Sequence, residues 1–297
     1  MVEERLLKWL ETAIAYSATD IHCHFQNRNS TLQLRTLGGL KSVYSVAEDL
    51  AVYQYLKYKA NLNLSVSMLP QTGTFEYVVH NKTWYCRFSA METLSTKSGV
   101  LRILNLSPIQ SLEDISDQKD EIDLIKQLLE KENGLILFAG ATGSGKSTTM
   151  FTGLKDVINK SIYTIEDPIE RIYDNIMQMQ VNQVSGFDFQ SGIKQLLRHD
   201  PDIIVIGEIR SPQEAQAAIR ACLSGHLVCA TIHASSAVST IYRLLDFSLS
   251  LHELEIVALN IVFQQLISFN NQRSAKLDIL TQDQTAQVIQ QTKADRQ

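Results

Sequence analysis

The sequence predicts an α/β protein of two domains, and three observations lead to this prediction. The chain has 297 residues, enough for one large or two ordinary domains. Strand-like and helix-like segments alternate after Gly134, which is typical of an open, doubly wound and mainly parallel sheet. The stretch 108–133 has eight acidic residues against three basic ones. We therefore expect a smaller α/β domain over 1–107, an acidic linker with a leading helix over 108–133, and a second domain over 134–297.

The N-terminal domain is expected to combine two helices with several strands. Residues 2–18 have the pattern of an amphipathic helix, and residues 46–62 predict a second one. Alternating apolar and polar residues predict strands at 20–26, 31–37 and 98–106, and a hairpin within 73–92 that turns at His80, Asn81 and Lys82.

The second domain begins with the apolar run 135–140, which reads as a central parallel strand that is covered on both faces. Further strands of this kind are predicted at 161–167, 202–208 and 226–234. Ser211, Pro212 and Glu214 form a capping box with proline in the first turn, so a helix should start there and end before Gly225. The C-terminal part is expected to be helical, and the polar, glutamine-rich residues 271–297 are expected to be frayed.

Composition excludes several classes of protein. The formal net charge of −5 argues against direct binding of nucleic acid, which depends on clustered lysine and arginine. Cys23, Cys86, Cys222 and Cys229 are scattered, so we expect buried thiols in a reducing cytoplasm and no zinc site. His22 and His24 would share a strand face, but without further clustered ligands they do not predict a metal site. Neither a signal peptide nor a transmembrane run is expected.

The most specific motif is GATGSGKST, which lies between a predicted strand and a predicted helix. It matches the phosphate-loop pattern G-x-x-x-x-G-K-[ST], in which glycines permit a tight loop whose amide groups point at phosphates. Lys146 would supply a cation to the β- and γ-phosphates of ATP, and the Ser147 hydroxyl would bind Mg²⁺. The residues predicted to bind the nucleotide are Gly140, Ala141, Thr142, Gly143, Ser144, Gly145, Lys146, Ser147 and Thr148.

Carboxylates follow two of the predicted strands. Glu166, Asp167 and Glu170 lie at the end of the strand 161–167, which we expect to be the neighbour of the strand that leads into the phosphate loop. A bound Mg²⁺–triphosphate would be the positive centre that makes this group of like charges favourable. Glu208 ends the strand 202–208, but Gly207 precedes it, so the site lacks the aspartate that many phosphate-loop enzymes use for Mg²⁺. The acidic groups must therefore come from two strands.

Two histidines flank the last predicted strand. His226 and His233 are seven residues apart and should lie near opposite ends of it. His233, at the carboxyl end where ligands bind in such sheets, is the better candidate for the site. A structural hydrogen bond is the alternative for each of them.

These motifs occur in the order found in the type II secretion and type IV pilus ATPase family, which the chain resembles over about 19–270. The matching segments are the phosphate loop, the Asp box TIEDPIE, the atypical Walker B segment LLRHDPDIIVIGEIR and the His box GHLVCATIH. The resemblance implies a RecA-like ATPase domain that follows a PAS-like N-terminal domain. The N-terminal match is weaker and depends on ATDIHCHF, YCRFSA and GVLRIL.

The family pattern implies a role for each site residue. Glu170 would be the general base for the attacking water, and Glu208 would hold Mg²⁺, through a water molecule. Glu166 and Asp167 would support the site electrostatically. His226 and His233 belong to the His box and are further catalytic candidates. The resemblance also makes Arg87 and Arg102 candidate arginine fingers at a domain or subunit boundary, with exposed strand residues as the alternative.

The chain departs from parts of the family. It lacks the four-cysteine zinc insertion of many assembly ATPases, their further N-terminal domains, and the retraction-type motif A-I-R-N near the C-terminus. In these respects it most resembles the competence-type ATPase of Gram-positive bacteria.

That resemblance implies a cytoplasmic homohexamer at the inner face of the membrane. Nucleotide turnover would change the angle between its domains, and the hexamer would act on a polytopic platform protein to assemble a competence pilus or pseudopilus for DNA uptake. The alternatives are a retraction or type II secretion ATPase, a RecA-like nucleic-acid translocase, and a nucleotide-dependent switch or scaffold.

Overall fold

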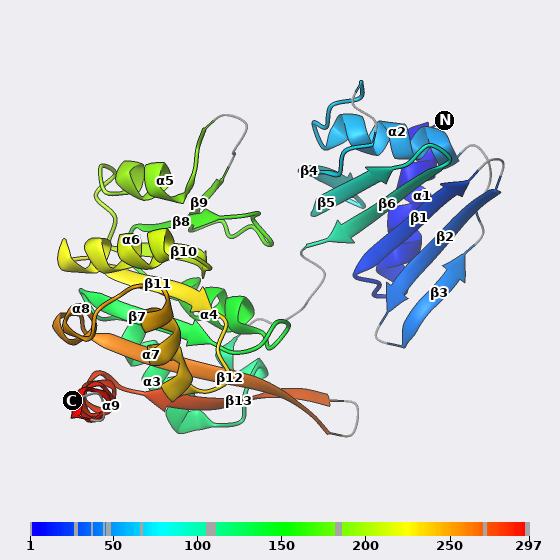
Figure 1. Ribbon diagram of the computed structural model, residues 1–297. Helices are drawn as coiled ribbons and strands as arrows, with labels where there is room; N and C mark the ends of the chain where they lie inside the picture. Colours follow the sequence, from blue (N-terminus) through cyan, green and yellow to red (C-terminus); the bar gives the residue numbers. More distant parts are fainter. Residues whose placement is uncertain are drawn as a thin grey trace. The chain divides into compact units, whose positions relative to one another are not determined.

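The chain forms two compact units, Met1–Pro108 and Ile109–Gln297 (Figure 1). The computed structural model describes residues 2–294 apart from 27–28, 37, 44, 46–48, 66–67, 105–110, 182–185 and 270–271. The expected domain boundary at 107–108 and the first residues of the helix expected at 46–62 lie outside the described residues. The α/β class that the sequence predicts is confirmed.

Unit 1 contains one antiparallel sheet of six strands in the order β3-β2-β1-β6-β5-β4. Its elements are α1 (Val2–Ala15), β1 (Asp20–Gln26), β2 (Asn29–Thr36), β3 (Gly39–Val43), α2 (Asp49–Lys59), β4 (Gln71–Val79), β5 (Lys82–Glu92) and β6 (Thr96–Ile103). The sequence analysis missed β3. The predicted hairpin is confirmed, because His80 and Asn81 have φ angles of 50° and 60°, as the two central residues of a type I′ turn require.

The two helices of unit 1 cover one face of this sheet. Along β1, Ile21, Cys23 and Phe25 are buried in the core that also contains Leu6 of α1 and Leu56 of α2. The residues between them point to the opposite face, as expected for the two-residue period of a strand. Hydrophobic burial on one face therefore fixes the position of both helices.

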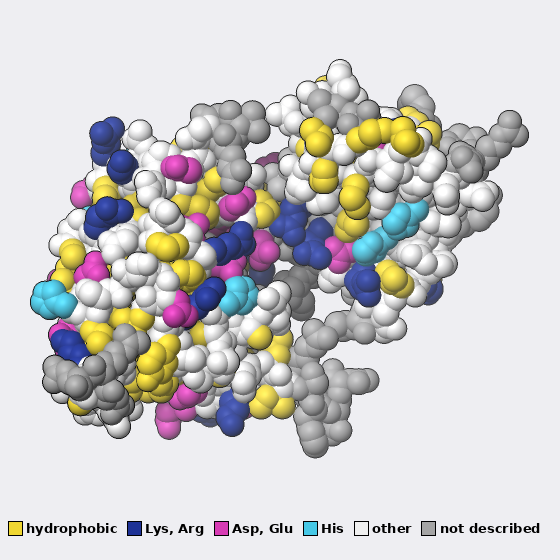
Figure 2. All heavy atoms as spheres, in the orientation of Figure 1, with side chains coloured by type: hydrophobic (Ala, Val, Ile, Leu, Met, Phe, Trp, Pro, Cys, Tyr) yellow, Lys and Arg dark blue, Asp and Glu magenta, His cyan; other side chains and the backbone are white. Residues whose placement is uncertain are grey.

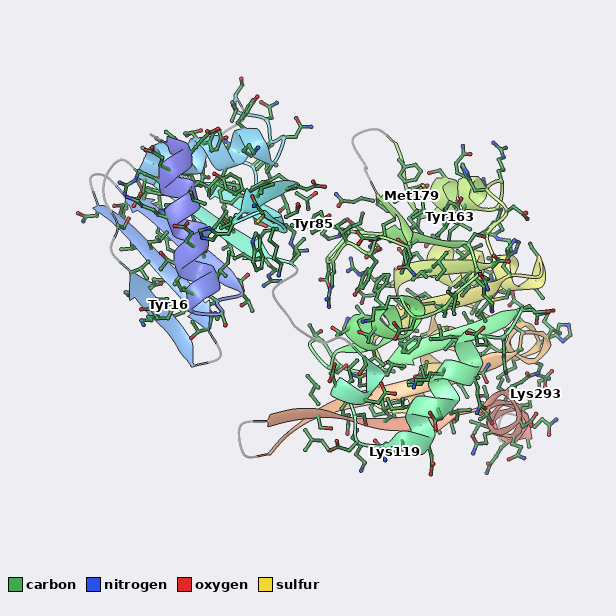
Figure 3. The ribbon with its side chains drawn as sticks, turned by 180° about the vertical axis from the view of Figure 1, so that it is seen from behind. Tyr16, Tyr85, Lys119, Tyr163, Met179 and Lys293 are labelled. Atoms are coloured by element: carbon green, nitrogen blue, oxygen red, sulfur yellow. The ribbon has the colours of Figure 1, made fainter. Side chains whose placement is uncertain are left out.

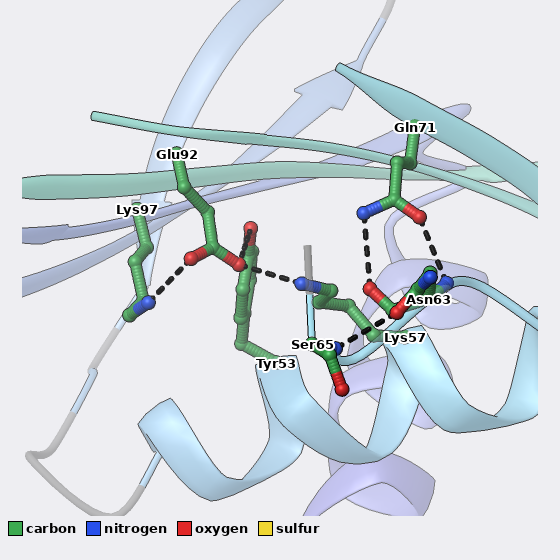
Figure 4. A network of polar contacts seen from close by, with 7 residues as sticks. All are labelled: Tyr53, Lys57, Asn63, Ser65, Gln71, Glu92 and Lys97. Carbon is green, nitrogen blue, oxygen red and sulfur yellow. Dashed lines mark hydrogen bonds and ion pairs between the residues drawn. The ribbon is translucent and has the colours of Figure 1, made fainter. Parts of the chain in front are cut away.

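A buried charged network ties α2 to the sheet (Figure 4). The Glu92 carboxylate accepts hydrogen bonds from Lys57 Nζ at 2.8 Å, from Lys97 Nζ at 2.6 Å and from the Tyr53 hydroxyl at 3.4 Å. The Lys57 side chain is 2% exposed and that of Glu92 is 7% exposed. Burial alone would raise the pKa of Glu92, but the two ammonium groups outweigh it and hold the pKa below its ordinary value.

Unit 2 contains a mixed seven-stranded sheet in the order β13-β12-β7-β11-β10-β8-β9, in which only the β12–β13 pair is antiparallel. Its helices are η1 (Leu112–Asp114), α3 (Lys119–Leu129), α4 (Lys146–Leu154), α5 (Phe189–Leu196), α6 (Pro212–Leu223), α7 (Ala237–Asp246), α8 (Leu251–Ile256) and α9 (Gln282–Ala294). Its strands are β7 (Gly134–Ala139), β8 (Ile162–Glu166), β9 (Met177–Gln180), β10 (Ile203–Ile209), β11 (Leu227–Ile232), β12 (Leu259–Phe269) and β13 (Gln272–Leu280).

Each face of this sheet has its own core. On β7, Leu135 and Leu137 pack into the core that includes α6 and α7, whereas Ile136 and Phe138 pack into the core that includes α3 and α4. The strand is buried along its whole length, which explains its uninterrupted apolar sequence. Most of the acidic segment expected as a linker belongs to this unit, since α3 contributes to the second core.

The prediction that the strand at 161–167 is the neighbour of β7 was wrong. The strand with Glu166 at its end is β8, which pairs with β10 and β9, and both β11 and β10 lie between β8 and β7. Tyr163 of β8 and Met179 of β9 mark the neighbouring pair in Figure 3. Because neighbouring strands lie about 4.8 Å apart, β8 is displaced from β7 by roughly 14 Å.

The expectation for residues 271–297 was also wrong. Residues 272–280 form β13, which pairs with β12, and 282–294 form α9. Ile289 of α9 is 1% exposed, and Lys293 makes an ion pair with Glu255 of α8. Burial of Ala275, Leu277 and Ile289 and the pairing of β13 with β12 outweigh the polar composition of this segment.

We expect replacement of Glu92 by glutamine to destabilise unit 1 by about 3–5 kcal/mol, because it leaves the buried Lys57 ammonium without its carboxylate. Trp9 and Trp84, the two tryptophans of the chain, both lie in this unit, so urea unfolding followed by tryptophan fluorescence measures its stability.

Lys97→Met is the control for this prediction, since Lys97 is 34% exposed and its loss should cost less than about 1 kcal/mol. The pKa of Glu92 is lowered by folding, so its contribution is present above the ordinary carboxyl pKa and is lost as the pH falls through the folded value. The difference in free energy of unfolding between wild type and Glu92→Gln should therefore shrink as the pH falls. Equal costs for the two variants at neutral pH would contradict this account of the network.

Candidate nucleotide site

The phosphate loop joins β7 to α4, as the motif predicts. Gly143 and Gly145 have φ angles of 76° and 89°, which favour glycine, and α4 begins at Lys146. The Lys146 ammonium is buried and donates to the carbonyl oxygens of Gly140 at 3.0 Å and Ala141 at 2.9 Å. The Ser144 hydroxyl is buried and has no hydrogen-bond partner in the described part of the chain. A buried cation that is bonded to neutral groups, beside an unsatisfied hydroxyl, fits a phosphate ligand.

Two carboxylates act electrostatically on Lys146. Burial lowers the pKa of Lys146, and the negative charges of Glu208 and Glu170 partly oppose this shift. Glu208 belongs to β10, and Glu170 lies four residues beyond the end of β8. The structure therefore brings together Lys146, Glu208 and Glu170, which come from three separate segments of the sequence.

The order of the strands arranges the polar groups along one edge of the sheet. β7, β11, β10 and β8 are parallel neighbours, so their carboxyl ends lie side by side. These ends carry, in that order, the phosphate loop, His233, Glu208 and Glu166. On the face of unit 2 seen in Figure 2, charged side chains of both signs lie together with a histidine. This edge is the place where ligands bind in open α/β sheets.

Glu208 is held by an arginine and a histidine. Both Nε and Nη2 of Arg210 bind Glu208 Oε2, at 2.7 and 2.6 Å, and His233 Nε2 lies 2.7 Å from Oε1. Hydrogen bonding to Glu208 raises the pKa of Arg210. The sequence analysis missed Arg210, although it lies only two residues beyond Glu208, because its role depends on the direction of its side chain.

Close packing against the neighbouring strand favours glycine at position 207. A Cβ atom at this position would lie 3.2 Å from Glu166 Cα and 3.3 Å from Glu166 Cγ, closer than side chains ordinarily approach. Glu166 on the neighbouring strand β8 therefore occupies the space that an aspartate before Glu208 would need. Close packing against β8 therefore disfavours an aspartate before Glu208.

The three acids of the Asp box have different surroundings. Glu166 is 4% exposed, and its Oε1 accepts hydrogen bonds from Thr164 at 2.7 Å and Gln178 at 2.9 Å. Burial raises the pKa of Glu166, which favours its protonated form. Asp167 and Glu170 are exposed. The residue closest to the strand is thus the one least suited to carry a charge.

The loop that contains Glu170 is fixed by side chains of β9 that the sequence analysis missed. Besides its bond to Glu166, Gln178 accepts from the Tyr173 amide at 2.9 Å and donates to the Arg171 carbonyl at 2.8 Å. The Tyr173 ring stacks on Phe151 of α4, with 5.1 Å between ring centroids. These contacts attach the loop to the helix that follows the phosphate loop.

Of the other predicted site residues, one belongs to unit 2 and two belong to unit 1. His226 is at the amino end of β11, where its Nδ1 lies 3.2 Å from the Ala221 carbonyl, so it belongs to the edge of the sheet opposite the phosphate loop. This is the structural hydrogen bond that the sequence analysis left as the alternative. Arg87 and Arg102 face each other on β5 and β6 of unit 1, and Arg102 Nε donates to Asp20 at 2.7 Å.

The four cysteines are buried and unpaired, as predicted. Within the described ranges, no cluster of three or more histidine, cysteine, aspartate or glutamate side chains could bind a metal ion. None of the described helices is long and apolar enough to cross a membrane.

Comparison with known proteins decides the family. The family model described as "Type II/IV secretion system protein" matches residues 1–296. The chain belongs to the Type II/IV secretion system protein family. It is 31% identical over 263 residues to competence protein ComGA of Bacillus subtilis, covering 87% of this chain and 74% of that one. It is 35% identical over 267 residues to ComGA of Halalkalibacterium halodurans, covering 88% and 77%.

Further members of the family agree with this assignment. The type II secretion system ATPase E of Vibrio cholerae is 32% identical over 263 residues, which cover 87% of this chain and 52% of that one. The crystal structure of the pilus retraction motor PilT with bound ADP superimposes with a TM-score of 0.74 at 24% identity, covering 98% of this chain and 89% of that one, and so shows the same fold. The predicted family and the prediction of an ATPase are confirmed.

Proposed function

We propose that this protein is the ATP-hydrolysing motor that drives assembly of a competence pilus or pseudopilus for DNA uptake. The observation that carries the proposal is the similarity to two proteins named for competence, over a region that includes both units and the whole candidate site. The scattered, buried cysteines favour it over assembly ATPases with a four-cysteine zinc insertion.

In this proposal unit 2 is a RecA-like domain that binds ATP at the phosphate loop. Lys146 holds the phosphates, and the Ser144 hydroxyl gains the partner that it lacks among the described residues. Ser147 and Glu208 hold Mg²⁺, the latter through water. Bound there, Mg²⁺ would neutralise charge on the phosphate oxygens. Arg210 and His233 orient the Glu208 carboxylate.

Glu170 is the proposed general base. It is exposed, so water can reach it, and its charge acts on Lys146, so it lies near the phosphate loop. Glu166 is a poor candidate for this role because it is buried and hydrogen-bonded within the strand edge.

Unit 1 is the proposed PAS-like domain, and Arg87 and Arg102 are its proposed arginine fingers toward nucleotide at a domain or subunit boundary. A guanidinium group suits the charge that develops on the transferred phosphoryl group. We propose that the protein acts as a homohexamer in the cytoplasm, and that it works on a polytopic platform protein at the inner face of the membrane.

We expect the three glutamates to differ when each is replaced by glutamine. Glu170→Gln should keep ATP and Mg²⁺ binding but lower the hydrolysis rate by about 10²–10⁴-fold, because the amide cannot accept the proton. Glu208→Gln should weaken the dependence on Mg²⁺ as well as turnover. Glu166→Gln should be the mildest, because burial already favours an uncharged group at that position. Steady-state hydrolysis and nucleotide binding of the three variants measure this order.

The chemical change is the same in all three variants, so each serves as a control for the others. A Glu166→Gln variant that is more damaging than Glu170→Gln would show that the base is assigned to the wrong carboxylate.

Specific ATPase activity should fall as the protein is diluted below the concentration at which it oligomerises, since the proposed arginine fingers act across a boundary between subunits. Activity and mass would be measured together over a dilution series. An unchanged specific activity in a sample shown to be monomeric would refute the proposed hexameric mechanism.

Lys146→Ala should nearly abolish ATP binding, because the phosphates lose their main side-chain cation.

In the source organism, deletion of the gene should abolish both surface pili and uptake of transforming DNA, and only the wild-type gene should restore them. A deletion strain with more pili than wild type would identify a retraction motor instead, and normal transformation would exclude the competence role.

A further inference from the structure

Gln264 is a buried polar residue in the middle of β12. Its side chain is 1% exposed, although a primary amide is costly to bury unless its hydrogen bonds are made. The strand runs past the phosphate loop after pairing with β7 as far as Phe263. The position of Gln264 on β12 therefore places a buried amide against the loop.

Both ends of this amide bind the phosphate-loop region. Nε2 donates to the Ser144 carbonyl at 2.7 Å, and Oε1 accepts from the Thr149 hydroxyl at 2.6 Å. One contact lies within the loop and the other in the first turns of α4. The Ser144 carbonyl fixes the orientation of the amide, because it can only accept, and exchanging the amide oxygen and nitrogen would place two acceptors opposite each other.

The loop packs directly on this residue. A Cβ atom at Gly140 would lie 2.4 Å from the Gln264 carbonyl oxygen, and one at Gly145 would lie 2.7 Å from Gln264 Nε2. Two glycines of the motif are therefore required for contact with β12 as well as for the backbone angles of the loop.

The bond to Ser144 determines which way one loop amide points. In a trans peptide the carbonyl and the following N–H point in opposite directions. Gln264 holds the Ser144 carbonyl toward its own amide, so the N–H of Gly145 points away from Gln264 and can face a phosphate.

We propose that Gln264 is a positioning residue that keeps the phosphate loop in its nucleotide-binding conformation. It acts through Ser144 and Thr149 and has no contact with the reacting atoms. The inference rests on the proposed role of the loop, and Lys146→Ala tests that role independently.

The test compares Gln264→Met with Gln265→Met in the full-length chain. Gln265 is the neighbouring glutamine on the same strand, but it is exposed. Methionine keeps most of the volume of glutamine and removes both hydrogen bonds. We expect Gln264→Met to raise the dissociation constant of a fluorescent ADP analogue about tenfold, which corresponds to about 1.4 kcal/mol, and Gln265→Met to change it by less than about twofold.

The kinetic constants distinguish positioning from a general effect on folding. Loss of positioning should raise KM for ATP in correctly folded protein, whereas partial unfolding should lower the active fraction and leave KM unchanged. Thr149→Val is the second variant, because it frees only the Oε1 end of the amide. We expect it to raise the dissociation constant about threefold, and it decides the question if Gln264→Met does not fold.

Nucleotide affinity within twofold of wild type in both Gln264→Met and Thr149→Val would overturn the proposal. If wild type binds ADP and Lys146→Ala does not, that result would leave the proposed nucleotide site intact. If wild type and Lys146→Ala behave alike, the proposed site itself is wrong.

Discussion

The parallel pairing of β7, β11, β10 and β8 is the constraint on which the candidate site depends. Parallel neighbours end at the same edge of a sheet, and each step between strands is about 4.8 Å. The phosphate loop, His233, Glu208 and the Asp box therefore follow one another along that edge. The strands are held by apolar cores on both faces, so the framework does not depend on the polar groups that it displays. Hydrophobic packing thus sets distances that electrostatics alone could not maintain among like-charged groups.

The three glutamates at this edge have different charged and polar neighbours, and this difference suits each of them to a different role. Glu208 pairs with the Arg210 guanidinium and lies within hydrogen-bond distance of the His233 ring. Glu166 has neutral donors and is buried, so its pKa is raised. Glu170 is exposed and acts on Lys146 through space. Three side chains of one chemical type therefore occupy three different electrostatic environments within a short distance along the sheet edge.

The features that the sequence predicted correctly have local causes. The His80–Asn81 turn, the capping box at Ser211 and the glycine-rich loop each depend on residues a few positions apart. The pairing of β12 with β13 was missed although it is local, since Phe269 pairs with Gln272. The position of β8 depends on contacts between distant segments, because β11 and β10 lie between it and β7. The roles of Arg210 and Gln264 also depend on such contacts, although a glutamine within the apolar run of β12 was a signal that could have been followed.

Gly207 shows how one packing contact distributes the acidic groups over two strands. Because Glu166 lies against it, a side chain directly before Glu208 would have to displace Glu166 by a few tenths of an ångström. In this chain the second charge comes from the loop after β8, which starts roughly 14 Å from β7. The loop must reach from β8 back toward the phosphate loop, so its conformation has to be fixed. Gln178 fixes it by binding both the loop backbone and Glu166. Placement of the proposed base therefore depends on β9, a four-residue strand at the edge of the sheet.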